Sequence, residues 1–478
     1  MLQLPDKLFI DNEWRDGAAG RRFPSVDPAT ETTIAELAFA DTSDVDAAVQ
    51  SSHRAMRGPW RAMPPEQRGA LLDRLADLIE AKKDLIARTE TLDMGKPLRE
   101  GYANVARSVR TCRYYAGAAD KLQGDSIPVG ANGFNFTLLE PLGVTAHITP
   151  WNYPFANACR SLPTALAAGC TVILKPASQT SLTTLMLAEL CAEAGFPAGV
   201  VNVVTGSGAE TGTALARHPL VRGITFTGSI STGKRIMAYA AEHVRPTVLE
   251  LGGKNPQIVF ADADIDAALT QTMRGAFTNA GQVCTSVSRV LVERPIYDDY
   301  VLRLKSSIEA LRIGNGLDDP DIGPLVSAEH LDDVSRFVTA GKEEGARLVT
   351  GGSRPRGFPK GYFLQPTLFA DVRPTMKIAS EEIFGPVLSI IPFNTDDEAL
   401  EIANGLELGL TSGVFTRDLR RAMRFVRELQ AGMVWVNEWF MSPVQVPHGG
   451  VKESGLGREQ GLLALRNYVQ VKDVGIRI

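Results

Sequence analysis

The sequence predicts an α/β protein built on parallel sheets, and the alternation of short apolar and helical segments supports this fold class. Short apolar runs alternate with helical patterns of roughly ten to fifteen residues, as in βαβ units. The length of 478 residues corresponds to about three domains, or two large ones, at roughly 150 residues each. Hydrophobic residues make up 44% of the chain and charged residues 22%, which excludes a disordered protein. Disordered chains lack the apolar residues that offset the entropy of ordering.

The first expected element is a helix over residues 66–90, where leucines and Ile79 recur on one helical face. Gly95 and Pro97 follow it as stop signals. The other expected elements are strands at 171–174, 200–204, 224–227, 257–260 and 290–292, a helix over 181–194 that ends before Gly195 and Pro197, a helical stretch after Gly233, and a helix after each of the last two strands. Since the strands are short and apolar, we expect them to lie buried in parallel sheets.

Two extended segments, 134–139 and 468–478, break this alternation. A late strand without a crossover helix could pair with another subunit, which motivates the hypothesis of a homo-oligomer. The glycine- and proline-rich segment 351–361 is expected to be a solvated turn rather than a domain linker.

The composition limits the cellular compartments and the classes of binding partner that we expect. The five cysteines are widely spaced and form no CxxC, which argues against a disulfide framework and a zinc knuckle. Six histidines without an HExxH motif leave no metal site to propose. Asp6 comes too early for a signal peptide, and prolines interrupt the longest uncharged stretch (141–159), so we expect a cytoplasmic protein without a membrane helix. The 55 acidic residues exceed the 50 basic ones by five, which gives no electrostatic reason to expect nucleic acid or a membrane surface as a partner.

Residues 228–234 match the phosphate-loop pattern GxxxxGK between an expected strand and an expected helix. Arg235 stands where a Ser or Thr would hold magnesium, and Asp262 after the strand 257–260 imitates the second half of such a site. One alternative is therefore a nucleotide hydrolase. Another is a dinucleotide site, because backbone N–H groups at a helix N-terminus attract any phosphate. A simple tight turn is the third.

Two further patterns are weaker. Residues 206–212, with Gly208 near their start, read GxGxxxG, one residue longer than the dinucleotide fingerprint, and a turn is the commoner explanation for such a run. The acids from Asp262 to Asp266 resemble a calcium loop, but Ala267 and Met273 stand where Gly and Glu are needed. We interpret these acids as the N-terminus of a helix.

Cys284 and Glu250 carry the strongest chemical signals. Small and polar neighbours surround Cys284, and a partly exposed thiol beside backbone donors is a setting that supports a thiolate. The alternative is that Cys284 is simply a small residue of the apolar core. Glu250 lies between two leucines at the end of an expected strand. It is either buried, with a perturbed pKa, or paired with Lys254.

These segments together resemble the NAD(P)-dependent aldehyde dehydrogenase superfamily, from about Lys7 to the C-terminus. The matching motifs are Pro141–Val144, Ile148–Pro154, Leu174–Ala177, Phe226–Ser229, Glu250–Lys254, Gly281–Cys284, Glu381–Pro386 and Gly455–Glu459. They occur in the family's order and approximate spacing. The resemblance implies an α/β fold with two Rossmann-like parallel-sheet domains and a small bridging sheet. It places an NAD(P)-binding domain at 1–121 and 142–250, a catalytic domain at 251–453, and a bridging or oligomerisation segment at 122–141 and 454–478.

The resemblance also implies roles. Cys284 would be the nucleophile, Asn152 would donate to the oxyanion, and Glu250 would activate water against the thioester. The implied cofactor-binding residues are Trp151, Lys175, Ser178, Gly208, Gly228, Ser229, Glu382 and Phe384, and the implied substrate-binding residues are Arg160, Tyr153, Thr278 and His448. The implied partners are a small aldehyde and further copies of the chain, as a homodimer or homotetramer.

Cofactor and substrate choice rest on single positions. Ser178 has no charge to repel a 2′-phosphate, so NADP is expected to be accepted, with NAD as the alternative. An Arg at position 160 occurs in the succinate-semialdehyde branch, where it would pair with a carboxylate; an ordinary helix ion pair is the alternative. Thr278 departs from that branch, and the loop 437–450 looks like the aminoaldehyde and betaine-aldehyde branch. We therefore expect an acidic or polar semialdehyde, with aminoaldehydes or broad aliphatic and aromatic aldehydes as alternatives.

Overall fold

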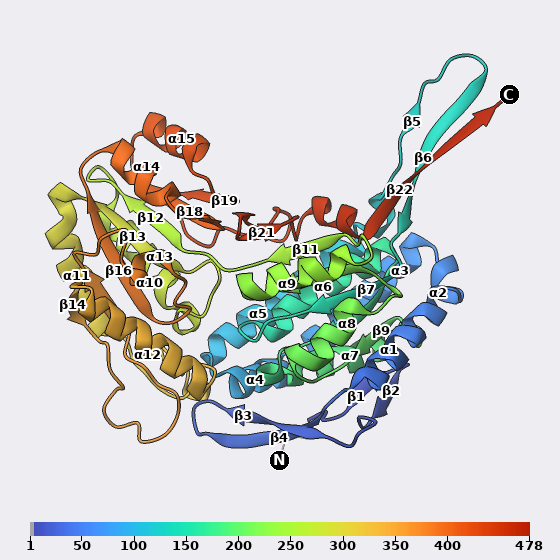
Figure 1. The fold of residues 1–478 in the computed structure, drawn as a ribbon, viewed down its shortest axis with the longest axis horizontal. Helices are drawn as coiled ribbons and strands as arrows, with labels where there is room; N and C mark the ends of the chain where they lie inside the picture. Colours follow the sequence, from blue (N-terminus) through green and yellow to red (C-terminus); the bar gives the residue numbers. More distant parts are fainter. Residues whose placement is uncertain (1–3) are drawn as a thin grey trace.

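The computed structural model describes residues 4–478 and contains two large sheets and a projecting arm (Figure 1). The first sheet has eight strands in the order β2 (Glu13–Arg15), β1 (Leu8–Ile10), β9 (Val201–Val203), β8 (Thr171–Lys175), β7 (Val144–Ile148), β10 (Val221–Thr227), β11 (Thr247–Glu250) and β21 (Gly455–Leu456). Its inner strands are parallel, and antiparallel strands lie at both edges.

The second sheet has seven strands and is parallel except at β14. Their order is β14 (Arg347–Thr350), β15 (Thr367–Ala370), β16 (Val387–Phe393), β13 (Val287–Glu293), β12 (Asn255–Val259), β18 (Thr411–Phe415) and β19 (Met433–Val436). Smaller two-stranded sheets pair β3 (Arg22–Asp27) with β4 (Thr32–Ala38), and β17 (Leu408–Gly409) with β20 (Val451–Lys452). The predicted α/β fold class with two parallel-sheet units is confirmed.

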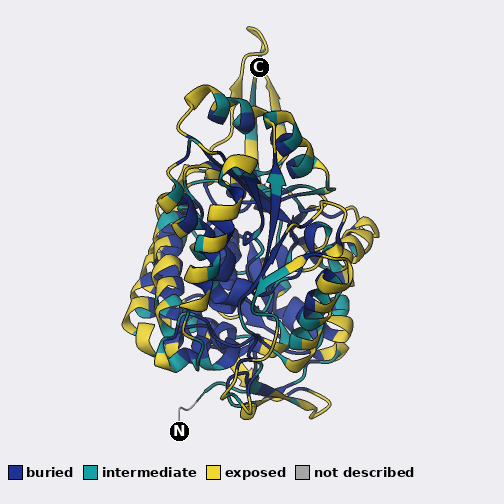
Figure 2. Cartoon of the chain, turned by 90° about the vertical axis from the view of Figure 1, so that its left-hand side faces the viewer, coloured by how far each residue is buried: buried dark blue, intermediate teal, exposed yellow. Residues whose placement is uncertain are grey.

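Helices surround both sheets (Figure 1). Those in the first half of the chain are α1 (Thr42–Ala55), α2 (Pro59–Ala62), α3 (Pro65–Ala81), α4 (Lys83–Met94), α5 (Leu98–Ala116), α6 (Pro154–Ala168), α7 (Leu182–Ala194), α8 (Thr213–Arg217) and α9 (Ile230–Ala241). Those in the second half are α10 (Ile265–Phe277), α11 (Tyr297–Glu309), α12 (Ala328–Glu343), α13 (Lys377–Ser380), α14 (Asp396–Asn404) and α15 (Leu419–Glu428). Figure 2 shows dark blue strands inside a shell of helices with yellow outer faces. Each large sheet has its own apolar core.

Every strand expected from the sequence is present, with bounds shifted by a few residues. The single helix expected over 66–90 is wrong, because the chain leaves helical geometry at Lys82 (φ −101°, ψ 16°) and forms α3 and α4 instead. No Gly or Pro marks this break. Gly95 ends α4 in the left-handed conformation (φ 90°), as its stop signal predicts. Helix α9 starts before Gly233, because Ser229 caps it.

The arm consists of β22 (Val469–Arg477), β6 (Gly133–Pro141) and β5 (Ser126–Ile127). Strand β22 pairs with β6 over nine antiparallel positions, so the C-terminal strand pairs with a strand of the same chain. The short strand β21, at the start of the predicted bridging segment 454–478, joins the first sheet beside β11. The functional division into domains stays a prediction.

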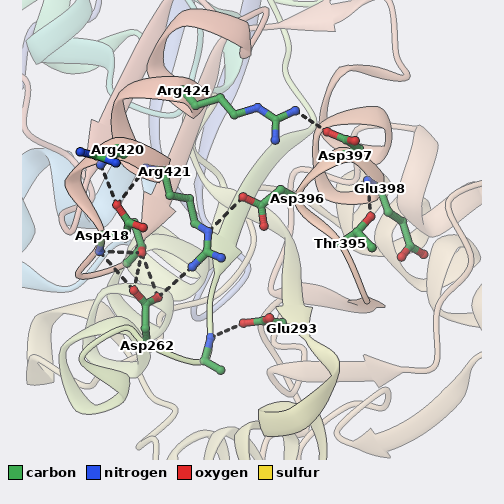
Figure 3. Close-up of polar contacts among 12 residues, drawn as sticks. Asp262, Glu293, Thr395, Asp396, Asp397, Glu398, Asp418, Arg420, Arg421 and Arg424 are labelled. Carbon is green, nitrogen blue, oxygen red and sulfur yellow. Dashed lines mark hydrogen bonds and ion pairs between the residues drawn. The ribbon is translucent and has the colours of Figure 1, made fainter.

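A network of acidic and basic side chains joins α14, α15 and the loop after β12 (Figure 3). Asp262 accepts hydrogen bonds from Thr416 Oγ1 and from the backbone N–H groups of residues 417 and 418. Asp418 caps α15, and Arg421 donates to Asp396 at 3.0 Å. Asp264 caps α10, as predicted for these acids, whereas Asp262 lies in the loop before that helix.

Candidate active site

A cavity of about 500 Å³ contains residues from both large sheets. The sequence-predicted residues that line it are Trp151, Asn152, Tyr153, Arg160, Gly228, Ser229, Glu250, Thr278, Cys284, Glu382, Phe384 and His448. Lys175, Ser178 and Gly208 do not line it. Twelve of the fifteen predicted site residues therefore surround a single cavity.

The carboxyl ends of parallel strands supply one wall. Ile148 at the end of β7 lies beside Lys175 at the end of β8, and Thr227 at the end of β10 lies beside Glu250 at the end of β11. Side chains that follow parallel strands meet at the same edge of a sheet, where α/β proteins bind ligands. Asn152 follows β7 at this edge.

Cys284 enters from the opposite side, ahead of β13. The turn before it, η4 (Thr278–Gly281), has left-handed backbone at Asn279 and Ala280, with φ values of 51° and 54°. Gly281 continues the turn at φ 72°, and a Cβ there would lie 2.3 Å from the Gly385 carbonyl oxygen. Asn255 then donates to the Cys284 carbonyl at 2.8 Å. This turn aims the cysteine at the strand ends of the first sheet, and such backbone conformations cluster at functional sites.

Asn152 fixes the geometry opposite the thiol. Its side-chain Nδ2 donates to the Gln282 carbonyl at 3.0 Å, and its Oδ1 accepts from the Tyr153 backbone at 3.1 Å. The amide is buried, with 4% exposed. One N–H of Nδ2 is committed to Gln282, and the amide's second N–H is available for an oxyanion.

The Cys284 thiol is half-buried in the cavity. Burial raises its pKa to about 12, while the positive charge of Arg160 acts to lower it. The polar sequence context is a setting that supports a thiolate, whereas burial in the folded protein acts against one. Loss of hydration outweighs the neighbouring donors, because it penalises the charged form directly.

Glu250 is buried, with 2% exposed, and burial raises the pKa of its carboxyl well above the usual range. Lys254 Nζ and both Glu250 carboxylate oxygens have no hydrogen-bond partner among residues 4–478, so the alternative of a Glu250–Lys254 pair is wrong. The side chain that faces the carboxylate is His448, whose Nε2 lies 3.9 Å from Glu250 Oε2.

Arg160 projects from α6 and forms a buried ion pair with Glu459. Its Nη2 also donates to Thr227 Oγ1 at 3.2 Å. The alternative interpretation of Arg160 is an ion pair within one helix. The partner acid, Glu459, instead comes from the C-terminal segment. Arg160 thus lines the cavity while its Nε pairs with an acid of the protein.

The opposite end of the cavity offers donors for a dinucleotide. Gly228 and Ser229 stand at the N-terminus of α9, where helix N–H groups attract phosphate. The Glu382 carboxylate accepts a hydrogen bond from the Gly253 backbone N–H at 3.1 Å. A Cβ on Gly252 would lie only 2.1 Å from its second oxygen, so the carboxylate packs directly against this glycine. These groups fit the pyrophosphate and ribose hydroxyls of NAD(P).

The three predicted residues outside the cavity lie at the end of β8, after β8 and after β9. Burial lowers the pKa of Lys175 to about 8, and its Nζ donates to the Pro176 carbonyl at 2.9 Å. Ser178 opens the turn η2 (Ser178–Thr180) after β8. Gly208 is exposed and opens the π-helical turn η3 (Gly208–Gly212), and a Cβ at this position would have open space around it.

Sequence reasoning missed several residues that line the cavity: Glu100, Arg107, Arg274, His330, Trp435, Phe440 and Ser442. Phe440 and Ser442 lie in the 437–450 loop, which the resemblance had singled out. His330 Nε2 lies within hydrogen-bond distance of the Phe384 carbonyl oxygen (2.8 Å), and its ring packs against Trp151. Arg107 and Arg274 lie on helices with no motif, so no local signal could have identified them.

The structure does not support a nucleotide hydrolase. Asp262 follows β12 in the second sheet, whereas residues 228–234 follow β10 in the first, so the two halves of the imitated site lie on different sheets. The Asp262 carboxylate already accepts hydrogen bonds from the backbone N–H groups of residues 417 and 418. Arg235 donates to Thr232 Oγ1. Within residues 4–478, no helix combines the length and apolar character needed to cross a membrane.

Comparisons with known proteins agree with this geometry. The model of the aldehyde dehydrogenase family matches residues 14–474. A hydroxyisobutyraldehyde dehydrogenase of Mycolicibacterium austroafricanum is 44% identical over 476 residues, which are 99% of this chain and 94% of the relative. The NAD+ complex of an aldehyde dehydrogenase from Bacillus cereus superposes with a TM-score of 0.97 at 41% identity, covering 99% of this chain and 96% of that one. Betaine aldehyde dehydrogenase from Staphylococcus aureus in complex with NAD+ superposes with a TM-score of 0.98 at 37% identity. The match covers 99% of this chain and 95% of that one. The chain belongs to the aldehyde dehydrogenase family.

Proposed function

We propose that this protein oxidises an aldehyde to the carboxylic acid with NAD(P)+, through a thioester on Cys284. The observation that carries the proposal is the single cavity in which Cys284, Asn152 and Glu250 meet the phosphate-binding end at Ser229 and Glu382. A nucleophile, an oxyanion donor and a buried base are the groups that this chemistry requires.

The cofactor would lie against the N-terminus of α9, with Glu382 and Lys175 toward its ribose hydroxyls. When bound, NAD(P)+ supplies the acceptor for the hydride that leaves the substrate carbon. Ser178 supports acceptance of NADP, because its hydroxyl carries no charge to repel a 2′-phosphate. NAD+ in the structural relatives supports NAD as well.

Cys284 acts first. Its sulfur adds to the aldehyde carbon, and the Asn152 amide and the Cys284 backbone N–H donate to the oxygen that becomes negative. A single donor of this kind typically contributes about 10²–10³ in rate. Burial raises the pKa of the Cys284 thiol, and the positive charge of Arg160 acts to lower it and so favours the thiolate.

Glu250 acts second. It takes a proton from a water molecule as the water oxygen adds to the thioester carbonyl, and Cys284 leaves as the thiolate. The raised pKa of the Glu250 carboxyl makes it a stronger base once ionised.

The substrate is proposed to be a small aldehyde without a charged carboxylate. A carboxylate clamp needs a guanidinium free for two parallel hydrogen bonds, and Arg160 already pairs with Glu459. Succinate semialdehyde, the expectation from Arg160 in the sequence, therefore stays a prediction with less support. The relatives are named for different aldehydes and do not decide between them.

The test is cofactor reduction followed by absorbance with NAD and NADP in parallel. The aldehydes are propanal, benzaldehyde, 4-aminobutanal and succinate semialdehyde, and Cys284→Ala is the control. A cysteine-dependent signal with propanal or benzaldehyde supports the proposal. A strong preference for succinate semialdehyde would return Arg160 to substrate recognition, and reduction by Cys284→Ala would refute the mechanism.

We also propose that the protein is a homo-oligomer through the arm. The arm projects from the molecule (Figure 1), and β22 forms its edge. Large apolar residues on it are exposed, with Phe134 and Val471 each at 64%. Exposed apolar edges favour pairing with another chain. A monomer mass in light scattering at micromolar concentration would refute this.

A further inference from the structure

The His448 and Glu250 side chains face one another inside the cavity and have no other polar contact at the facing atoms. Their closest atoms, His448 Nε2 and Glu250 Oε2, lie 3.9 Å apart. The two residues are buried, with 6% and 2% exposed. Among residues 4–478, neither Glu250 oxygen nor His448 Nε2 has a hydrogen-bond partner. Buried polar atoms without partners are rare, and two that face each other point to a shared role.

The backbone around His448 is fixed against the base. The His448 N–H donates to the Glu459 carbonyl at 2.7 Å, and the Glu459 N–H donates to the His448 carbonyl at 2.8 Å. Gly449 follows with φ 148°, and a Cβ there would lie 2.5 Å from Glu250 Oε1. The loop thus closes against the Glu250 carboxylate, and only glycine fits between them.

The second imidazole nitrogen of His448, Nδ1, has a hydroxyl group within reach. His448 Nδ1 lies 3.5 Å from Ser442 Oγ, within reach of a hydroxyl that donates. When Nδ1 accepts from Ser442, the ring proton stays on Nε2, the nitrogen that faces Glu250. A hydrogen bond between His448 Nε2 and Glu250 requires the two side chains to come closer than this 3.9 Å separation.

We infer that His448 is a positioning residue for the hydrolytic step: its Nε2–H donates to the ionised Glu250 carboxylate and holds it toward the thioester on Cys284. The inference rests on the proposed function of Glu250. It assigns a role to a side chain that the sequence associates only with substrate contact.

The charges around the pair agree with a neutral donor. Burial, with the positive charges of Arg160, Arg107 and Arg458, lowers the pKa of His448 well below its usual range. The ring therefore stays neutral and donates one hydrogen bond without transferring a proton.

The same surroundings disfavour the ionised base. Burial and the negative charge of Glu459 raise the pKa of Glu250, while Arg160 and Arg458 act to lower it. The Cys284 thiol, which also faces this space, is neutral at rest because of its own raised pKa. A donated hydrogen bond favours the ionised carboxylate, so His448 lowers the pH at which Glu250 becomes a base.

In the hydrolytic step, water oxygen bonds to the thioester carbonyl carbon and one water proton moves to Glu250 Oε2. The carbon–sulfur bond then breaks, Cys284 leaves as a thiolate, and the substrate leaves as the carboxylic acid, which ionises in solution. No electrons enter or leave in this step. His448 keeps its proton throughout.

The test separates the two halves of the reaction in the full-length protein. The first NAD(P)H formed is measured by stopped flow, and release of carboxylate from the preformed acyl-enzyme is measured by quenched flow between about pH 5 and 10, a range that spans the titration of a carboxyl with a raised pKa. The variants are His448→Phe, which keeps the ring volume without a donor, and His448→Gln, whose amide can still donate.

For His448→Phe we expect hydrolysis to be slowed about tenfold more than the first NAD(P)H phase, and the acid limb of the hydrolysis profile to shift to higher pH by about one unit. His448→Gln should recover most of the rate and of the shift. An unshifted acid limb, or equal slowing of both phases, would overturn the inference and make His448 a substrate contact. A wild-type protein that forms no acyl-enzyme would instead refute the proposed function.

Discussion

The charge network between α14 and α15 and the group of charges around Cys284 use the same side-chain types in opposite ways. In the network, Arg421 and Arg424 each reach two acids, and all of these side chains retain contact with solvent. In the cavity, Glu250 and His448 are buried, and their facing atoms lack any partner among residues 4–478.

The difference shows where the fold tolerates unfavourable contacts. An exposed ion pair contributes about 0–1 kcal/mol, so the network is locally satisfied and energetically mild. A buried polar group without a partner costs about 1–3 kcal/mol, and the cavity contains several. Such an arrangement persists when the surrounding structure holds it in place and function requires reactive groups.

The largest expected effect is at the nucleophile. Cys284→Ala should abolish NAD(P)H formation, because no other thiol lines the cavity among the described residues. Steady-state assays at high protein concentration test this, with Cys170→Ala as a control that removes a thiol buried away from the cavity. Substantial turnover by Cys284→Ala would show that the cavity chemistry has been assigned to the wrong group.

Glu250→Gln should lower kcat by about 10²–10⁴ while leaving a first burst of NAD(P)H. The amide keeps the volume of the side chain but cannot accept a proton from water. Stopped-flow measurement of burst amplitude and steady rate separates the two steps. Loss of the burst together with the steady rate would place Glu250 at the first step.

Removing one partner of the buried Arg160–Glu459 pair should lower the stability of the protein. Arg160→Met leaves Glu459 buried and unpaired, which should lower the free energy of unfolding by about 3 kcal/mol. Adding Glu459→Gln should recover most of that loss. Urea unfolding of the single and double variants measures both. An undisturbed single variant would mean that the pair is not a structural contact in solution.

The pH dependence of Cys284 ionisation tests how strongly burial affects the groups in the cavity. Since burial raises the pKa of Cys284 to about 12, its thiolate fraction in the free protein should rise about tenfold per pH unit below that value. Alkylation by iodoacetamide between about pH 7 and 10, quantified by mass spectrometry of the Cys284 peptide, measures this rise. A rate already at its plateau at neutral pH would mean that Arg160 and the backbone donors outweigh burial.

Sequence patterns predict the residues of the cavity better than their protonation. Cys284, Asn152 and Glu250 are predicted from motifs that resemble those of the aldehyde dehydrogenase family, and all three line the cavity. The helix break at Lys82 and the partner of Arg160 could not be predicted, since the first has no Gly or Pro and the second joins residues from distant parts of the sequence. Neither could the pKa of Cys284, because desolvation depends on the packing of both sheets around the thiol.

The smallest expected effect lies in the network of Figure 3. Arg424 contacts Asp397 and Glu428, but side-chain exposures of 40%, 81% and 48% leave all three groups hydrated. Arg424→Ala should therefore change neither kcat nor Cys284 alkylation, and should lower the thermal midpoint far less than Arg160→Met. Scanning calorimetry of the two variants under one buffer makes the comparison direct. Equal destabilisation would mean that exposed networks contribute as much as buried pairs here, and that partner number rather than burial sets their contribution.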